Sequence, residues 1–332
     1  MKDEQESSAG RESAHWSEQD EEAAGYWQLK LLLVLFRILP VFILRLIMFP
    51  VGFFYFIFSK RGRKESRRFL QRAAPFIDDP KIAKKCRAPL APLRHIVSFS
   101  LAITEKIQSW GNRFSFDNIQ FQDDDMADLI GELEKGKGVL VVCSHLGNTE
   151  LMRGLSYFDK TGVSHSVAVT AIMDMKTTSH FTRMLKELNP QSEMNIISSE
   201  EIGPQTVVFI EEKIAEGGLV AIAGDRTKAE GKNIMIPFLG EDAPFPAGIF
   251  YMSCMIEAPV YFAFGLRRRD LSLIPKYDIH VHRSTGFFGS TRKERFEKST
   301  ELARSFASLL ENYCKKKPFQ WYNFYDFWNK GV

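Results

Sequence analysis

The chain contains 332 residues, of which 45% are hydrophobic and 26% are charged, so it can bury the core of one large or two modest globular domains. Its net charge of +3 gives no indication of a nucleic-acid partner. The four cysteines lie far apart without a Cys-x-x-Cys pair, which is more typical of a reducing compartment than of a disulfide framework or zinc site. Aromatic residues make up 13% and gather near the two ends, which indicates a lipid-facing or acyl-lined surface.

The first 75 residues have an unusual composition. Residues 1–24 are acidic, rich in Ser and poor in apolar side chains, which predicts a disordered tail. Residues 25–75 are predicted to form a membrane anchor and a basic juxtamembrane segment. The strongly apolar part, 29–58, would extend roughly 45 Å as one straight helix, against a bilayer core of about 30 Å. Five residues interrupt it, namely Lys30, Arg37, Arg45, Pro40 and Pro50.

Three interpretations of this apolar segment remain open. A tilted or kinked span would have its carboxyl end in the cytoplasm, because six basic residues follow within 60–68. A monotopic helix would insert only partly, with its arginines reaching lipid phosphates. A buried core helix is the third interpretation. The length and apolarity of the segment favour membrane attachment over a core helix, but they do not separate spanning from partial insertion.

Residues 76–332 show alternating helical and strand patterns, which we interpret as one domain. The predicted strands are 139–143, 166–170, 195–197, 218–223 and 259–264. The predicted helices are 80–110 with a break near Pro89 and Pro92, one that begins at 123–125 and is closed by Gly136, and others at 177–188 and 204–216, with further helix starts at Asn148 and Gly248. The alternation predicts an α/β fold with a mainly parallel central sheet flanked by helices.

The most informative short segment follows the strand 139–143. His145 lies directly after this strand, and Glu150 lies five residues later in the first turn of the predicted helix. Ligands in open α/β sheets bind at the carboxyl ends of strands, and imidazole is the side chain best suited to take a proton near neutral pH. Glu150 could orient the ring while a substrate hydroxyl gives up its proton. The alternative is a purely structural His–Glu hydrogen bond that supports the turn.

A second group of polar residues follows the strand 218–223. Asp225 and Arg226 come directly after it, so they are predicted to lie at the same sheet edge as His145. A local Asp–Arg salt bridge is the alternative interpretation. Downstream, prolines and glycines between 237 and 248 predict a rigid loop that leads to a helix start near Gly248, where free backbone amides can receive a phosphate or carbonyl oxygen.

Together these residues resemble the bacterial lipid A biosynthesis lauroyl/myristoyl acyltransferases, within the lysophospholipid acyltransferase superfamily. The resemblance rests on Ser144–Glu150, Gly224–Arg226, Phe238–Gly240 and Pro244–Gly248, which occur in the family's order. It extends to His15-Trp16, the apolar segment and the closing residues 318–328, and thus covers nearly the whole chain. The ending 323–328 is most similar to a branch associated with aryl polyene or other lipid-conjugate gene clusters, so the acceptor could differ from lipid A.

The resemblance implies an enzyme on the cytoplasmic face of the bacterial inner membrane. It would move a fatty acyl chain from an acyl carrier protein thioester to a hydroxyl of a lipid or glycolipid, without a covalent acyl-enzyme and without a metal or organic cofactor. His145 would be the general base with Glu150 as its partner, and Asp225 would help to organise the site; the family usually has Asp-Gln where this chain has Asp225-Arg226. The implied substrate-binding residues are Asn148, Asp225, Arg226, Gly240, Phe245, Pro246 and Gly248.

Two other functions remain open from the sequence. A thioesterase-like acyl hydrolase would use water in place of the alcohol. A non-catalytic membrane scaffold would bind lipids or carrier protein through its basic clusters. Neither alternative requires a nucleic-acid partner.

Overall fold

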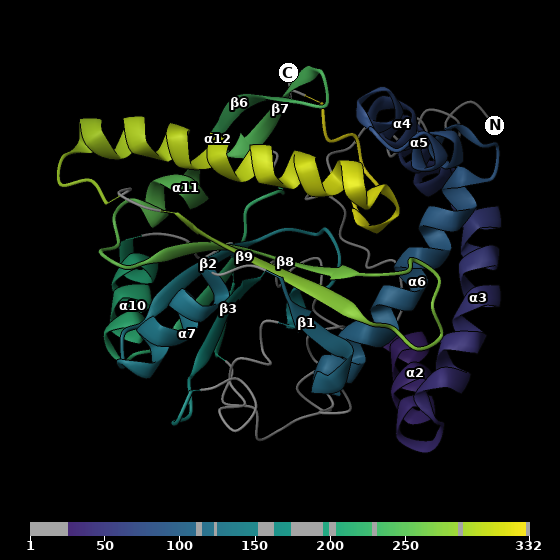
Figure 1. Ribbon diagram of the computed structural model, residues 1–332, viewed down its shortest axis with the longest axis horizontal. Coiled ribbons are helices and arrows are strands. Elements are labelled where there is room, and N and C mark those ends of the chain that lie inside the picture. Colours follow the sequence, from purple (N-terminus) through teal and green to yellow (C-terminus); the bar gives the residue numbers. More distant parts are fainter. Residues whose placement is uncertain are drawn as a thin grey trace, which may run out of the picture.

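The computed structural model describes residues 26–110, 115–122, 125–151, 163–173, 195–198, 204–227, 231–284 and 288–329. Within these ranges the chain has a mixed α/β fold in which helices cover a central sheet (Figure 1). The predicted mainly parallel sheet with flanking helices is confirmed. The predicted tail at 1–24, the predicted helix at 177–188 and most of the helix predicted from Asn148 lie outside the described residues.

The central sheet has seven strands in the order β1-β9-β8-β2-β5-β3-β4. The strands are β1 (Ile119–Phe121), β2 (Val139–Cys143), β3 (Val169–Met173), β4 (Asn195–Ser198), β5 (Leu219–Ala223), β8 (Val260–Arg267) and β9 (Tyr277–Ser284). Neighbouring strands are parallel except for the β8–β9 pair, so β9 and β1 run against the other strands. All five predicted strands are present, although β3 begins at Val169 instead of 166 and β8 continues to Arg267.

Both faces of the sheet are covered, and for this reason the central strands are apolar throughout. Leu140 and Val142 of β2 face one core, whereas Val139 and Val141 face the other. Helices α10 (Pro204–Ala215), α11 (Ala247–Ser253) and α12 (Arg292–Lys316) contribute to the first core, and α7 (Asp125–Glu134) contributes to the second. Because successive strand residues point to opposite faces, a strand between two cores has no polar side.

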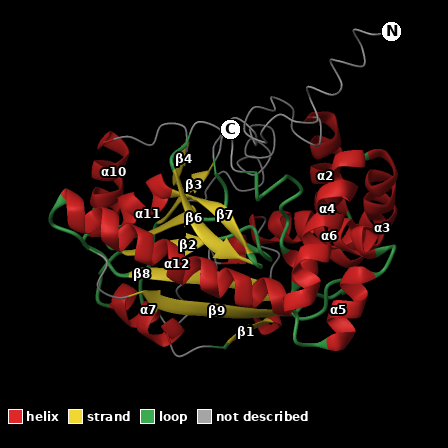
Figure 2. Ribbon diagram, turned by 90° about the horizontal axis from the view of Figure 1, so that it is seen from above, coloured by secondary structure: helices red, strands yellow, loops and turns green. Residues whose placement is uncertain are grey.

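The amino-terminal helices gather at one end of the sheet (Figures 1 and 2). They are α2 (Tyr26–Ile38), α3 (Val41–Phe58), α4 (Lys60–Ala73), α5 (Pro80–Arg87) and α6 (Ala91–Trp110). The apolar segment is therefore two helices with a break at Pro40, as expected of a residue that lacks a backbone N–H, whereas α3 continues through Pro50. At about 1.5 Å per residue, the 18 residues of α3 extend about 27 Å.

Helix α3 packs closely on α6. A Cβ atom at Gly52 would lie 2.7 Å from Ser100 Oγ and 3.0 Å from Val97 Cα, so a side chain at position 52 would push the helices apart. Ser100 Oγ donates a hydrogen bond to the Met48 carbonyl at 3.0 Å. In the described part of the chain, α3 is the one helix long and apolar enough to cross a membrane, but this property is shared with core helices and signal sequences.

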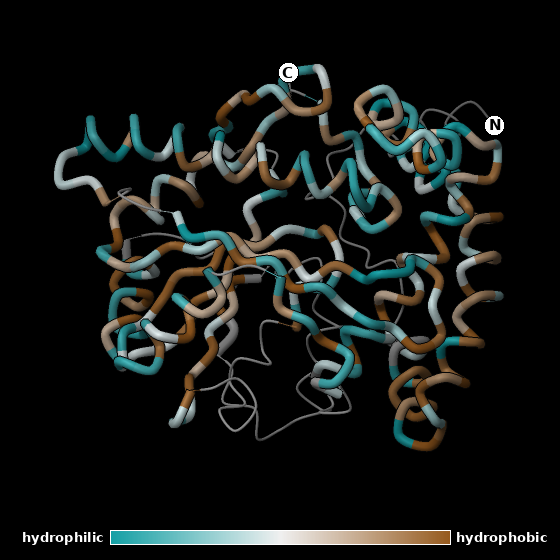
Figure 3. Tube along the Cα trace, in the orientation of Figure 1, coloured by the Kyte–Doolittle hydropathy of each residue, from teal (hydrophilic) through white to brown (hydrophobic). Residues whose placement is uncertain are grey.

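The two sides of α3 differ in exposure. Arg45 lies on the buried side with Leu44, Met48 and Gly52, and its guanidinium contacts Glu105 of α6 at 2.6 Å. The predicted contact of this arginine with lipid phosphates is therefore wrong. Figure 3 shows that α2 and α3 are largely hydrophobic along their length. Their exposed apolar residues are Leu31, Val34, Ile38, Phe42, Leu46, Ile47, Val51, Phe53, Phe54, Ile57 and Phe58.

The segment 233–246 differs from the sequence-based prediction. It forms an antiparallel hairpin of β6 (Asn233–Phe238) and β7 (Glu241–Pro246) instead of an irregular rigid loop. Prolines usually weaken strand pairing, but this two-stranded sheet consists only of edges, where a missing N–H can be tolerated. The turn between its strands places Leu239 at φ 51° and Gly240 at φ 83°. The predicted helix start near Gly248 is confirmed, because α11 begins at Ala247.

Candidate active site

The site lies where two neighbouring parallel strands end. β2 and β5 pair in a register that sets Cys143 opposite Ala223. His145 comes two residues after Cys143, and Asp225 comes two residues after Ala223, so the two side chains emerge at the same level of the sheet edge. The Gly224 amide also donates to the Cys143 carbonyl at 2.8 Å, which keeps the two chain segments together past the strand ends. The prediction that Asp225 shares the sheet edge of His145 is confirmed.

His145 and Asp225 form a hydrogen-bonded pair. His145 Nδ1 lies 2.7 Å from Asp225 Oδ1. The second oxygen of the carboxylate accepts hydrogen bonds from the His145 amide at 2.8 Å and from the Trp321 indole N–H at 2.9 Å. The side chain of Asp225 is fully buried, whereas 26% of the His145 side chain is exposed. The carboxylate is thus held by three donors, while one edge of the imidazole remains accessible.

This geometry changes the predicted role of Glu150. The sequence analysis assigned the orientation of the imidazole ring to Glu150, but the carboxylate that holds Nδ1 belongs to Asp225. Glu150 lies in the turn after His145, where its backbone N–H donates to Asn148 Oδ1 at 3.1 Å. Burial lowers the pKa of Lys106 overall, and the nearby Glu150 carboxylate acts in the opposite direction by favouring the charged ammonium. Glu150 therefore belongs to the charged surroundings of the pair.

The carboxyl-terminal segment forms one wall of the site. Trp321 pairs with Leu146 in an isolated β-bridge, the Gly147 amide donates to the Gln320 carbonyl at 2.8 Å, and the Tyr322 amide donates to the His145 carbonyl at 3.1 Å. Trp321 is fully buried. Most of the closing aromatic residues from Trp321 to Trp328 are buried in the interior, and their segment holds the turn that carries His145.

Two glycines allow this turn to approach β8. Gly147 has φ 77°, and a Cβ atom there would lie 2.1 Å from the Gly265 carbonyl oxygen. A Cβ atom on Gly265 would lie 2.5 Å from the Asn148 carbonyl oxygen. The Asn148 amide donates to the Gly265 carbonyl at 2.8 Å as a result of this close approach. Any larger residue at either position would displace the loop that positions His145.

The surroundings of the pair favour a neutral imidazole. Burial, together with the nearby Arg226 and Lys106, lowers the pKa of His145 to about 4, although Asp225 acts in the opposite direction. Burial alone would raise the pKa of Asp225, but the imidazole and the N–H donors around its carboxylate lower it overall. At neutral pH the pair is therefore a neutral histidine with an ionised aspartate. Because an ionised carboxylate only accepts, the ring proton lies on Nδ1 and the lone pair lies on Nε2.

Lys106 is a site residue that the sequence analysis missed. It lies on α6, almost forty residues before His145, and is half-buried. Burial lowers its pKa, and the electrostatic effects of Glu150, Arg226 and Asp225 on Lys106 place it within this charged group. The available signal was a single lysine within a largely apolar helix, which is also the pattern of an ordinary exposed lysine. Only the position of α6 beside the carboxyl-terminal segment, which contacts the His145 turn, distinguishes the two.

Arg226 and Asn148 lie beside the pair, as predicted. Arg226 donates through Nε to Asn323 Oδ1 and through a terminal nitrogen to the Tyr322 carbonyl, both at 3.3 Å. The Asp225 side chain binds His145 and Trp321, whereas Arg226 binds Asn323 and Tyr322. These contacts differ from the local Asp–Arg salt bridge that was the alternative interpretation. Asn148 is buried, and its side-chain oxygen caps the turn that leads to Glu150.

The other predicted binding residues are placed mainly by packing. Phe245 is fully buried, with its ring edge-on to those of Phe238, Phe306 and Phe327, so it is accounted for as a core residue. Gly240 forms the β6–β7 turn, Pro246 precedes α11, and Gly248 has open space around its α-carbon. α11 has only seven residues, so its start offers a weak dipole. The contacts of these four residues give no support for their predicted substrate-binding role.

Cys143 is the other nucleophilic side chain near the pair. Burial raises the pKa of its thiol to about 12, so a thiolate is scarce at neutral pH. It belongs to the core beneath the sheet, together with Val139 and Val141. In the described residues no group of three or more His, Cys, Asp or Glu side chains has the arrangement of a metal site.

The fold and site define an α/β protein with a neutral His–Asp pair at the carboxyl ends of parallel strands, an arrangement suited to removing a proton from a bound hydroxyl. The family described as bacterial lipid A biosynthesis acyltransferase matches residues 15–330, and the chain belongs to this family. Membership indicates acyltransferase activity on a lipid. Comparison with individually curated proteins gives no match.

Proposed function

We propose that the chain is a membrane-associated O-acyltransferase that moves a fatty acyl chain from an acyl carrier protein thioester to a hydroxyl of a lipid or glycolipid. The observation that carries this proposal is the 2.7 Å contact between His145 Nδ1 and Asp225 Oδ1 at a partly open sheet edge. The family supplies the reaction class, and the pair supplies the base that the reaction needs.

In the proposed reaction, His145 Nε2 takes the proton of the acceptor hydroxyl as its oxygen attacks the thioester carbonyl carbon. The new C–O bond forms, and the carbonyl becomes a tetrahedral oxyanion. The C–S bond then breaks, and the imidazolium returns the proton to the leaving sulfur. Asp225 stabilises the imidazolium throughout, because its ionised carboxylate faces Nδ1–H. The products are the acylated lipid and the free carrier-protein thiol, and the reaction needs neither an oxidant nor a covalent acyl-enzyme.

Two cations near the pair can stabilise the negative charge of this intermediate. Lys106 and Arg226 both lower the pKa of His145, which means that both lie within electrostatic reach of the ring. We assign the oxyanion to the Lys106 side, because Arg226 is already engaged by the carboxyl-terminal segment. A well-placed donor of this kind contributes about 3 kcal/mol to transition-state stabilisation. We further propose that Glu150 keeps Lys106 protonated, a role that replaces direct contact with the imidazole.

Attachment to the bilayer is part of the proposal. The exposed apolar side of α2 and α3 provides the surface, and exposed basic residues of α4, Lys60, Lys64 and Arg67, follow it directly. Because the other side of α3 is packed on α6, crossing the bilayer would also bury part of the catalytic domain. Partial insertion, with the domain on the cytoplasmic face of the inner membrane, therefore fits better than spanning.

The ending 323–328 is the basis for proposing an acceptor from another lipid conjugate in place of lipid A.

The test is acyl transfer by purified His145→Ala protein. The assay follows a labelled acyl group from carrier-protein thioester into total bacterial lipid, with mass spectrometry of the products. His165→Ala is a matched control, because His165 is exposed at the surface and lies 3.9 Å from Glu134. We expect loss of the acylated lipid for His145→Ala and full activity for the control. Unchanged transfer by His145→Ala would refute the proposed base.

The same assay separates the two alternative functions. A hydrolase would release free fatty acid at the same rate with and without acceptor lipid, whereas a transferase requires the lipid for rapid thioester consumption. A scaffold would show neither product, yet would still bind vesicles or carrier protein. Partial exposure of the imidazole is compatible with water as well as an alcohol, so the acceptor dependence is the decisive measurement.

A further inference from the structure

The hairpin that joins β8 to β9 has an apolar tip beside α3. Leu271 packs into the small core formed by Met48 of α3 with Val97 and Leu101 of α6. The next apolar residues point outward instead: the exposed fraction is 39% for Leu273 and 68% for Ile274. In Figure 1 the hairpin extends past the end of the sheet to lie next to α6 and α3.

The tip is an ordered turn with basic flanks. The Arg268 amide donates to the Lys276 carbonyl at 2.8 Å, and Ser272 Oγ donates to the Ile274 carbonyl at 2.6 Å. Arg268, Arg269 and Lys276 are all exposed around the apolar residues. Arg268 is engaged by Asp278 at 2.7 Å, so Arg269 and Lys276 are the cations best placed to meet an external anion. Apolar residues between cations are typical of segments that enter the headgroup region of an anionic bilayer.

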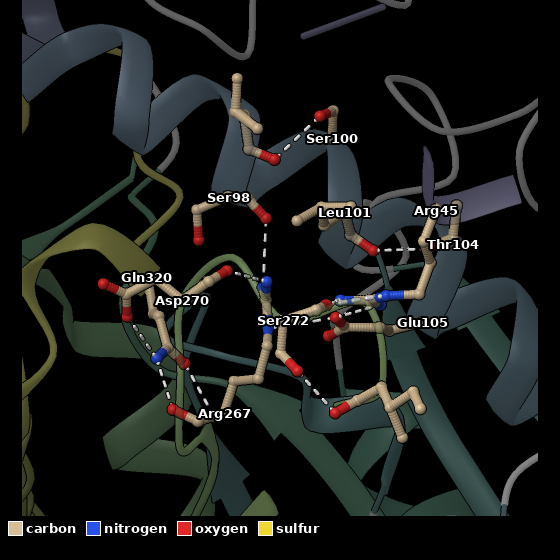
Figure 4. A network of polar contacts seen from close by, with 12 residues as sticks. Arg45, Ser98, Ser100, Leu101, Thr104, Glu105, Arg267, Asp270, Ser272 and Gln320 are labelled. Atoms are coloured by element: carbon tan, nitrogen blue, oxygen red, sulfur yellow. Dashed lines mark hydrogen bonds and ion pairs between the residues drawn. The ribbon is translucent and has the colours of Figure 1, made fainter. Parts of the chain in front are cut away.

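Buried ionic contacts hold this tip against α3 (Figure 4). Arg45 Nε donates to the Ser272 carbonyl at 3.0 Å, and the same guanidinium lies 2.6 Å from Glu105 Oε1. Arg267, at the base of the hairpin, lies 3.1 Å from that Glu105 oxygen. The three ionic side chains are at most 1% exposed. The hairpin tip is thereby fixed relative to the helix that carries the apolar surface.

We propose that the tip Leu273–Ile274 is a second membrane-inserting element, which enters the lipid headgroup region beside α3. This inference rests on the proposed membrane association and adds a part of the chain more than two hundred residues away from α3. The occupant is an anionic bilayer, because the exposed apolar side chains lie on a tip held beside α3, the helix that carries the exposed apolar surface, and their neighbours carry positive charge. With two separated contacts, the catalytic domain has a defined orientation on the lipid surface.

The experiment uses an environment-sensitive fluorophore on a single introduced cysteine. The four native cysteines are buried, so labelling of the folded protein is directed to the new site. The probe position is Ile274→Cys, and the reference position on α3 is Phe54→Cys, which is 57% exposed. Phe296→Cys is the matched control, because Phe296 is 66% exposed and belongs to the first turns of α12, at the opposite end of the molecule (Figure 1).

Vesicles of phosphatidylethanolamine and phosphatidylglycerol are then added. We expect a blue shift and a severalfold rise in emission at positions 274 and 54, and no change at 296. A response at 54 without one at 274 would overturn the hairpin inference and leave membrane association intact. No response at either position would overturn both. A response at 274 that depends on protein concentration without vesicles would indicate a second copy of the chain and would also overturn the inference.

A second measurement tests the energetic importance of the tip. Ile274→Asp should weaken partitioning to the same vesicles about tenfold, whereas Phe296→Asp should leave it unchanged. Transfer to a detergent-dispersed acceptor should be the same for both variants, because neither residue belongs to the site. Equal partitioning of the two variants would overturn the inference, and circular dichroism identifies a variant that fails to fold, in which case Leu273→Asp replaces it.

Discussion

Two clusters of buried charge in this protein have similar components and opposite properties. In one, Asp225 faces the neutral imidazole of His145 across 2.7 Å, and the imidazole is partly exposed. In the other, Glu105 lies between the guanidiniums of Arg45 and Arg267, and all three side chains are buried. A carboxylate is the common element. Its partner decides whether the cluster can exchange a proton.

The guanidinium cluster has a fixed charge. Burial alone would lower the pKa of Arg267, but Glu105 raises it overall, so the cation remains protonated at any ordinary pH. Its directional hydrogen bonds connect α3, α6 and the hairpin after β8, which is a structural role. The neutral imidazole of His145 can accept a proton from a substrate and give it back, and its open edge gives a substrate access. The His145–Asp225 pair is therefore the candidate for catalysis, whereas the Arg45–Glu105–Arg267 cluster holds α3 in place.

The largest expected effect is on catalysis by Asp225→Asn. The amide keeps the shape of the carboxylate but can present an N–H to Nδ1, which would shift the proton to Nε2 and remove the base. In the serine-protease triad the corresponding change lowers kcat about 10⁴-fold, and we expect a similar loss of transfer rate here. Steady-state kinetics with carrier-protein thioester measure it. Asp242→Asn, on the exposed part of the β6–β7 hairpin, is the control, and a rate within tenfold of wild type for Asp225→Asn would contradict the assignment.

The next largest effect is on stability, through Glu105→Gln. This change leaves two buried guanidiniums without a counter-charge, and breaking a buried ionic contact in this way costs about 3–5 kcal/mol of the free energy of unfolding. Urea denaturation measures the difference. The control Glu297→Gln removes an exposed carboxylate 3.9 Å from Lys293 and should change stability by less than about 0.5 kcal/mol. Equal effects of the two changes would show that the buried cluster is not a structural connection.

A smaller effect concerns the second buried histidine, His95. Its Nε2 donates to the Trp321 carbonyl at 2.9 Å, and its Nδ1 lies 3.0 Å from Ser66 Oγ. Burial lowers the pKa of His95 to about 4. Between pH 6.5 and pH 4 the unfolded chain binds the proton and the folded chain does not. The free energy of unfolding therefore decreases as the pH is lowered through this window, by up to about 3 kcal/mol.

The same window includes His145, so two histidines contribute to the acid loss of wild-type stability. Replacing His95 by Gln removes one of the two contributions. We therefore expect a clearly shallower pH dependence of the unfolding free energy in His95→Gln, whatever its stability at pH 7. An unchanged slope between pH 6.5 and pH 4 would show that His95 is protonated in the folded protein.

The sequence predicted the elements with strong local patterns. The strand at 139–143, the helix at 204–216 and the neighbourhood of His145 and Asp225 all follow from apolar runs and their polar ends. The partner of His145 could not be predicted, because Glu150 is close in sequence whereas Asp225 becomes close only when β2 and β5 pair. The burial of Arg45 was missed for a similar reason, since Glu105 and Ser272 come from distant segments. Contacts between segments that are distant in the sequence cannot be predicted from local patterns.

The β6–β7 hairpin shows another limit of sequence patterns. Its prolines indicate an irregular loop, but in an isolated two-stranded sheet both strands are edges, where a missing N–H is tolerated. α12 was also absent from the predicted elements, although it is the longest described helix, with 25 residues and a capping box at Thr291 and Glu294. Its sequence mixes apolar and charged residues, and the apolar ones lie along one side of the helix that is buried in the core.

The smallest expected effect sharpens the comparison by changing the charge beside the imidazole. Burial and Arg226 together lower the pKa of His145, so in wild type the acid limb of kcat/KM should lie near pH 4, well below the ordinary histidine value. In Arg226→Gln the cation is absent and the imidazolium becomes easier to form, so the limb should move to higher pH. Arg226→Lys keeps the charge and should leave the limb close to its wild-type position.

Comparing the two variants separates charge from contact. Both lose the bonds of the arginine to Asn323 and Tyr322, so any common fall in rate reports the position of the carboxyl-terminal segment. Only Arg226→Gln loses the positive charge, so only this variant should lose activity selectively at pH 5 relative to pH 7. Identical pH profiles for the two variants would show that Arg226 acts through its hydrogen bonds alone, and the proton affinity of His145 would then have to be set by burial and Lys106.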